Sequence, residues 1–152
     1  MPRKKRITKK VLFAKTVQIM QPLLGLQDWK LIVRYSTRMR DTADCEASPE
    51  YKEAVIRINL NDLKGLGYND IVSTAIHEMM HCIVWPLAGW AETLSRTDRD
   101  MKICEDIEET LVTNLEKIIV PLAADIIQAK LKAQGYLNID LGFVQLDVAH
   151  EE

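Results

Sequence analysis

The sequence predicts a single α+β domain, in which a small antiparallel or mixed sheet packs on two long helices. Three observations support this prediction. Two short segments alternate apolar and polar residues, as strands do. Two later and longer segments repeat apolar residues at helical spacing. The chain has 152 residues, the length of one ordinary domain, and neither an internal repeat nor a linker divides it.

The first half of the chain is expected to supply one helix and two strands. The helix is predicted at 8–21, because apolar residues recur there at helical spacing before Pro22 interrupts the pattern. Strands are predicted at 29–35 and 54–60, where apolar side chains alternate with polar ones and β-branched residues are frequent. The segment between them, 36–50, is polar and is expected to be a loop.

The second half of the chain is expected to be mainly helical. The segment 70–85 is apolar nearly all round, which is typical of a central, buried helix, and Pro86 is expected to end it. A second helix is predicted at 98–120. Pro121 then marks either a kink or the first turn of a further helix. The last residues, 136–152, alternate only in part and are expected to form an extended tail, with an added strand as the alternative.

Charge and composition exclude several classes of protein. The 20 basic and 22 acidic side chains nearly cancel, so the net charge of −2 gives no general reason to bind nucleic acid or a membrane. Residues 1–8 are rich in lysine and arginine, and are expected to be a flexible end with at most a weak affinity for nucleic acid. The three cysteines lack the spacing of a disulfide framework. Neither a leader nor an apolar run of ~20 residues is recognised, so a cytoplasmic protein is expected.

His77, Glu78 and His81 form the motif HExxH within the predicted central helix. Four residues of helix turn through about 400°, so the two imidazoles project within about 40° of each other, one turn apart. Such a pair can bind one tetrahedral metal ion through nitrogen. Glu78 lies on the adjacent edge of that face, where it can act as a base without binding the metal. The alternative is a pair of core histidines that polar neighbours satisfy.

A third protein ligand for this metal must come from another segment. His150 lies near the end of the chain and is expected at the surface, which leaves a carboxylate on the helix at 98–120. The candidates are Glu105, Asp106, Glu108 and Glu109. Glu108 projects from the apolar stripe of that helix, where an unpaired carboxylate is costly and a metal ion would explain it. Glu108 is therefore the first choice, and Glu105 is the second.

Four stretches, at 29–33, 54–59, 77–87 and 105–116, carry a resemblance to known proteins. With them the chain resembles the small HExxH metallopeptidases of phages and prophages. It is more distantly similar to the ImmA/IrrE and SprT-like peptidases. The resemblance implies a minimal zincin-like fold with one Zn²⁺. It also implies that a glutamate early in the helix after the active-site helix is the third ligand, which matches Glu108.

Motif and resemblance together predict a zinc-dependent metallopeptidase that hydrolyses a peptide or protein substrate. A metal-activated water attacks the peptide bond, with Glu78 as general base. The strand at 54–60 is expected to pair with an extended substrate, and Tyr51, Tyr68 or Tyr136 to stabilise the oxyanion. The alternative is a non-catalytic regulatory or binding protein that keeps a zinc-stabilised peptidase fold. Glu78 favours catalysis, since a purely structural zinc site has no need of it.

Overall fold

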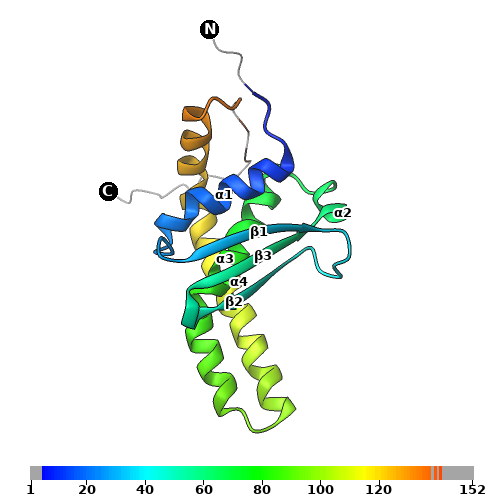
Figure 1. Ribbon diagram of the computed structural model, residues 1–152, viewed down its shortest axis with the longest axis vertical. Helices are drawn as coiled ribbons and strands as arrows, with labels where there is room; N and C mark the ends of the chain where they lie inside the picture. Colours follow the sequence, from blue (N-terminus) through cyan, green and yellow to red (C-terminus); the bar gives the residue numbers. More distant parts are fainter. Residues whose placement is uncertain (1–4, 138, 140, 142–152) are drawn as a thin grey trace, which may run out of the picture.

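The computed structural model, which describes residues 5–137, 139 and 141, has the predicted α+β architecture (Figure 1). A three-stranded sheet lies across two long helices that form an antiparallel hairpin, and the hairpin continues beyond the sheet. The elements in chain order are α1 (Lys9–Leu23), β1 (Lys30–Ser36), β2 (Ala43–Ser48), the short 3₁₀ helix η1 (Pro49–Tyr51), β3 (Glu53–Asn59), α2 (Leu60–Leu63), α3 (Tyr68–Leu94) and α4 (Asp98–Ala133).

The sheet is mixed, with β3 as its central strand. β1 pairs with β3 in parallel, so that Lys30 lies opposite Glu53, whereas β2 pairs with β3 antiparallel, with Ala43 opposite Ile58. The two strands that the sequence indicated are therefore neighbours, but they run in the same direction. Because both edges of β3 are occupied, the expectation that the strand at 54–60 pairs with a substrate is wrong. The edge strand beside the helical hairpin is β2 (Figure 1).

Strand β2 lies within the segment 36–50 that was predicted to be a loop, and that prediction was wrong for these residues. Ala43, Cys45 and Ala47 of β2 pack against the core, while the alternate residues Asp44 and Glu46 carry charge. An edge strand with one solvated face needs neither bulky nor β-branched residues on that face. The polar composition of the segment therefore concealed its alternation.

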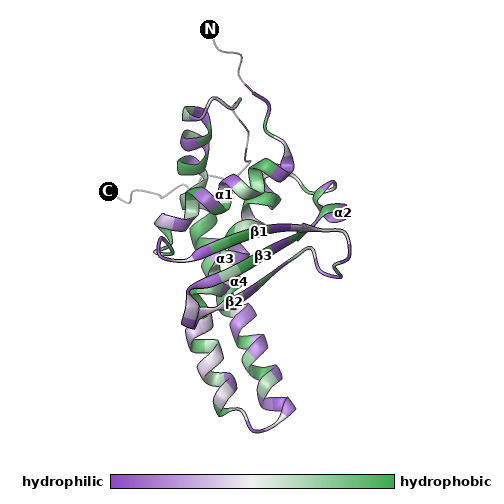
Figure 2. Ribbon diagram, in the orientation of Figure 1, coloured by the Kyte–Doolittle hydropathy of each residue, from purple (hydrophilic) through white to green (hydrophobic). Residues whose placement is uncertain are grey.

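The apolar core lies where α1 and the inner face of the sheet cover α3. Phe13 of α1, Ile56 and Ile58 of β3, and Ile76 and Met79 of α3 are all fully buried. Figure 2 shows that α3 is strongly hydrophobic where the sheet passes over it, and more mixed in the hairpin beyond. The core thus holds the middle of α3, including the HExxH motif, in a fixed position against the sheet.

Two prolines that were expected to interrupt helices lie inside them. α3 continues past Pro86 to Leu94, so the end predicted there is wrong. Pro121 lies inside α4, so of its two predicted roles it does not begin a further helix. A proline removes one backbone hydrogen bond and crowds the preceding turn. Ala88 of α3 and Ala123 of α4 are both buried, so each helix stays packed against the domain beyond its proline. That packing compensates for the lost hydrogen bonds, and the sequence alone did not reveal it.

The described parts of the two chain ends meet each other. Lys5 and Tyr136 form an isolated parallel bridge, and Ile7 is buried in the core. Residues 5–7 are therefore attached to the domain, although the first eight residues were expected to be flexible. Residues 1–4 and most of the predicted tail at 136–152 lie outside the described residues.

Helix α3 is long and apolar enough to cross a membrane by length and composition alone. In the structure, 56% of its most apolar window is buried inside the protein, against α1, α4 and the sheet. Core helices of soluble proteins commonly have this character. Packing within the domain therefore accounts for the apolar composition of α3.

Candidate metal centre

His77 and His81 lie one turn apart on the middle of α3, on the face that meets α4. The helical setting predicted for the HExxH motif is therefore confirmed. The two imidazole rings have centroids 5.2 Å apart and planes inclined by 70°. Both side chains are mostly buried. The spacing of the motif thus brings two ring nitrogens close together, as a shared metal ion requires.

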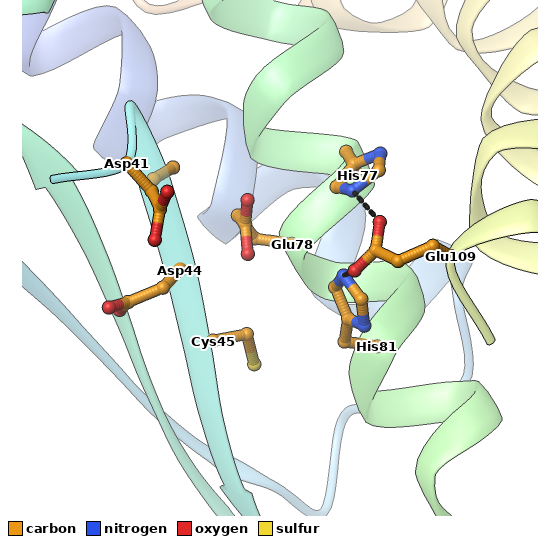
Figure 3. A pocket seen from close by; sticks show the side chains of 8 residues that line it. Asp41, Asp44, Cys45, His77, Glu78, His81 and Glu109 are labelled. Carbon is orange, nitrogen blue, oxygen red and sulfur yellow. Dashed lines mark ion pairs between the residues drawn. The ribbon is translucent and has the colours of Figure 1, made fainter. Parts of the chain in front are cut away.

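Glu109 of α4 places its carboxylate between the two rings (Figure 3). One oxygen lies 3.6 Å from His77 Nε2, and the other lies 3.4 Å from His81 Nε2. A tetrahedral zinc ion with bonds of ~2.1 Å separates its ligand atoms by about 3.4 Å. The three ligand atoms lie within 4.8 Å of one another. His77, His81 and Glu109 therefore form a candidate His-His-Glu metal site.

The opposite nitrogens of the two rings are held by other glutamates of α4. His77 Nδ1 lies 2.9 Å from Glu116 Oε2, and His81 Nδ1 lies 2.8 Å from Glu108 Oε1. An ionised carboxylate can only accept a hydrogen bond, so each ring donates its Nδ1–H. Each Nε2 then carries the lone pair and points toward Glu109. This is the tautomer that a histidine needs to bind a metal through Nε2, and a carboxylate partner also raises its basicity.

A hydroxyl supports one of these two carboxylates. Ser73, one turn before His77 on α3, donates a hydrogen bond from its Oγ to Glu116 Oε1. Glu116 Oε2 in turn accepts from His77. The chain of contacts from Ser73 through Glu116 fixes the orientation of the His77 ring.

Glu108, predicted as the third ligand, lies against Nδ1 of His81 rather than between the Nε2 atoms. Glu108 is mostly buried, as its place on the apolar stripe predicted, since its side chain is only 12% exposed. Glu109 was the less favoured candidate because it lies off the apolar stripe, and its side chain is 60% exposed. Glu105 and Asp106 are exposed and outside the candidate site. That Glu108 binds the metal stays a prediction, while the geometry favours Glu109.

Glu116 was not among the ligand candidates predicted on α4. A signal for it was present, because Glu109 and Glu116 are seven residues, or about two turns, apart and so share one face of α4. Both project toward the histidines of α3. The spacing alone therefore places both glutamates on the face of α4 that meets the histidines.

Glu78 is buried beside the histidines, with only 6% of its surface exposed. Its carboxyl group lies between β2 and the imidazole pair (Figure 3). Burial, together with the negative charges of Asp44 and Glu109, raises its pKa to about 8. No hydrogen bond from the described part of the chain stabilises its charged form. In the metal-free protein this carboxyl group therefore holds its proton at neutral pH.

A polar cavity of about 450 Å³ opens beside these residues. Its lining residues are Asp41, Ala43, Asp44, Cys45, His77, Glu78, His81 and Glu109. One wall is β2 with the loop before it, and the other is α3 with Glu109 of α4 (Figure 3). The candidate metal site is therefore reachable from solvent on the side of the edge strand.

The tyrosines suggested as oxyanion donors do not line this cavity, as far as the described residues show. Tyr51 lines a different cavity with Arg34 and Glu46. Tyr136 pairs with Lys5, and Tyr68 begins α3. Their proposed role stays a prediction that these positions do not support. His150 lies outside the described residues.

No protein-family model matches this chain, and no curated protein is similar to it in sequence. The resemblance to small phage metallopeptidases therefore rests on the HExxH motif and its surroundings. The structure adds the α+β fold and the candidate His77, His81 and Glu109 site on which a functional argument can be built.

Proposed function

We propose that the protein is a zinc-dependent metallopeptidase in which His77, His81 and Glu109 bind one Zn²⁺ and Glu78 is the general base. The observation that carries this proposal is the pairing of the ring nitrogens. Both Nε2 atoms face the Glu109 carboxylate at 3.4–3.6 Å, while both Nδ1 atoms face supporting carboxylates. Two core histidines that merely needed hydrogen-bond partners would not require a third carboxylate between them.

Zinc suits this set of ligands. Two imidazole nitrogens and one carboxylate oxygen are ligands that zinc accepts, and catalytic zinc sites have three protein ligands and one open position. The exposed side of Glu109 and the adjacent cavity leave room for that position. A dication would also offset the negative charge that Glu108, Glu109 and Glu116 concentrate around the two rings.

Glu78 is placed to move a proton during peptide hydrolysis. The metal, when bound, polarises the scissile carbonyl and makes water acidic enough to attack near neutral pH. Glu78 takes a proton from the attacking water and passes it to the leaving nitrogen. The positive charge of a bound Zn²⁺ would favour the ionised form of Glu78, whose pKa in the metal-free protein is about 8. The base is therefore available when the metal is present.

The substrate is proposed to lie along β2. This strand is at the edge of the sheet and forms one wall of the cavity that contains Glu78. An extended peptide can add to such an edge through backbone hydrogen bonds. That position would bring a peptide bond past the histidine pair. The role first expected of the strand at 54–60 thus passes to its neighbour.

The ligand assignment is tested by comparing three variants, Glu109→Gln, Glu108→Gln and Glu105→Gln, for zinc affinity. Loss of a direct ligand should abolish stoichiometric binding in Glu109→Gln. Glu108→Gln should weaken binding by about 10- to 100-fold, because it removes only a supporting charge. Glu105, one turn before Glu109 and exposed, is the matched control and should have no effect. The opposite ranking of the first two variants would make Glu108 the ligand.

The His77→Ala variant tests whether a metal site exists at all. It should remain folded, because His77 lies at the edge of the core, and lose stoichiometric zinc. Metal content is measured by mass spectrometry of the native protein. Unchanged zinc in this variant would end the metal hypothesis.

Catalysis is separated from metal binding by Glu78→Gln. This variant keeps the size of the side chain but removes the base, so turnover should fall by about 10²–10⁴-fold while zinc content stays the same. Casein and a peptide library are suitable first substrates. An active parent whose variant cuts equally fast would refute the role of Glu78. A zinc-loaded parent that cuts none of them would favour the non-catalytic binding protein.

A further inference from the structure

Two cysteines meet across one wall of the cavity. Cys45 is on the edge strand β2 and Cys82 is on α3, 37 positions later, with their Sγ atoms 3.6 Å apart. Cys82 is fully buried, whereas Cys45 is partly exposed and lines the cavity (Figure 3). Their separation in the sequence gave no indication of this contact. Both belong to elements that the core holds together, since α3 packs against β2.

We propose that Cys45 and Cys82 are an oxidation site, at which an internal disulfide fastens β2 to α3. A disulfide has sulfurs ~2.05 Å apart, so the two atoms must approach by about 1.5 Å. Sulfurs already in contact show that the two side chains point toward each other, which is the main geometric requirement. Among the described residues β2 pairs only with β3, so its other edge is free to follow a small movement.

The reaction needs a two-electron oxidant, either a hydroperoxide or a small disulfide. With hydrogen peroxide, two S–H bonds and the O–O bond break, and one S–S bond forms. The two protons and two electrons released by the thiols convert the peroxide to two water molecules. With a small disulfide, exchange leaves the protein oxidised and two small thiols reduced. Cys45 is the thiol that an oxidant reaches from the cavity, and the buried Cys82 completes the bond.

The third cysteine provides an internal control. Cys104 is on α4, and its sulfur lies 3.5 Å from the hydroxyl of Ser95 near the turn of the hairpin. It has no part in the pair formed by Cys45 and Cys82. The proposal does not depend on metal binding, so it can be tested separately from the proposed peptidase activity.

The experiment uses the full chain, reduced and then freed of reductant, with a chelator present. It is exposed to a glutathione buffer rich in the oxidised form, or to a small excess of hydrogen peroxide. Its three thiols should fall to one, and the intact mass should fall by two hydrogen atoms. Peptide mapping should join Cys45 to Cys82, and a thiol reductant should reverse the change. The Cys104→Ser variant should behave in the same way, with no free thiol left.

Three results would overturn the proposal: three thiols that persist in the folded protein, a bridge that includes Cys104, or stable glutathione adducts in place of the bridge. Cys45→Ser and Cys82→Ser should each prevent the internal bridge. If either fails to fold, the mapping of the wild-type chain and of Cys104→Ser still decides the question. The His77→Ala variant should form the same bridge, which separates this result from any failure of the zinc hypothesis.

Discussion

Replacing Glu78 with glutamine should stabilise the metal-free protein, and the gain should grow as the pH rises. Glu78 is 6% exposed, and burial is the main cause that raises its pKa to about 8, from an ordinary value of 4.5. Glutamine has nearly the same shape but does not ionise. The variant therefore removes the cost of a buried charge while leaving the packing around α3 unchanged.

The size of the effect follows from the two pKa values. Below pH 4.5 the carboxyl group is protonated in both the folded and the unfolded chain, and Glu78 costs nothing. Between pH 4.5 and about 8 the folded state binds more protons than the unfolded state, so the free energy of unfolding falls as the pH rises. Each pH unit in this range lowers the free energy of unfolding by about 1.4 kcal/mol. Between pH 5 and pH 8 the loss amounts to about 3 kcal/mol.

The measurement is urea unfolding of the wild type and of Glu78→Gln at several values between pH 5 and pH 8, with a chelator present. Other ionisable groups titrate alike in the two proteins, so their contributions cancel in the difference between the two free energies of unfolding. Glu105→Gln, at an exposed position, is the control and should give a difference that does not vary with pH. We expect the free energy of unfolding of the wild type to fall below that of Glu78→Gln as the pH rises. A difference between the two proteins that stays constant within about 0.5 kcal/mol over this range would refute the reasoning. Saturating zinc should reduce this difference in the free energy of unfolding, because a nearby dication favours the ionised form of Glu78.

Three further predictions concern the support of the site and the fold. Glu116→Ala should lower zinc affinity by about 10- to 100-fold in a chelator competition assay, because His77 loses the carboxylate that fixes its tautomer; an unchanged affinity would contradict this role. Phe13→Ala should lower the free energy of unfolding by about 3–5 kcal/mol, since its side chain is fully buried, and zinc stoichiometry should not change. Thr97→Ala should cost about 1 kcal/mol in urea unfolding, because its Oγ1 caps α4 by accepting a hydrogen bond from Asp100 N at 3.1 Å. A cost below the error of the measurement would mean that the cap is not needed.

The elements that could be predicted from sequence are those rich in large apolar residues. The segment of the HExxH helix is apolar nearly all round, and the strands β1 and β3 alternate large apolar residues with polar ones. β2 escaped detection because its core-facing residues are small and its other face is charged. The proline at 86 was given too much weight, since a sequence pattern does not reveal the packing that compensates for a missing hydrogen bond.

The candidate site was predictable in kind but not in detail. Local spacing placed His77 and His81 on one face, because the geometry of a helix alone determines it. Periodicity on α4 could show that Glu108 projects inward, but not which ring nitrogen it meets. That choice depends on how α4 is placed against α3, which is a long-range property. The contact between Cys45 and Cys82 depends on an unpredicted strand and was equally inaccessible.

The candidate metal site is assembled across one pair of antiparallel helices, and this arrangement limits how the chain can change in length. An extra residue in α4 between Asp98 and Glu108 would rotate one part of the helix against the other by about 100° and shift it by about 1.5 Å. The start of α4 and the glutamates after the insertion could then not both keep their contacts with α3. An extra residue between Ser95 and Thr97 leaves the facing surfaces of both helices in register. Seven extra residues in each helix keep the facing surfaces aligned to within about 20°. The reach of the hairpin beyond the sheet can therefore vary in steps of two turns while the metal ligands stay together.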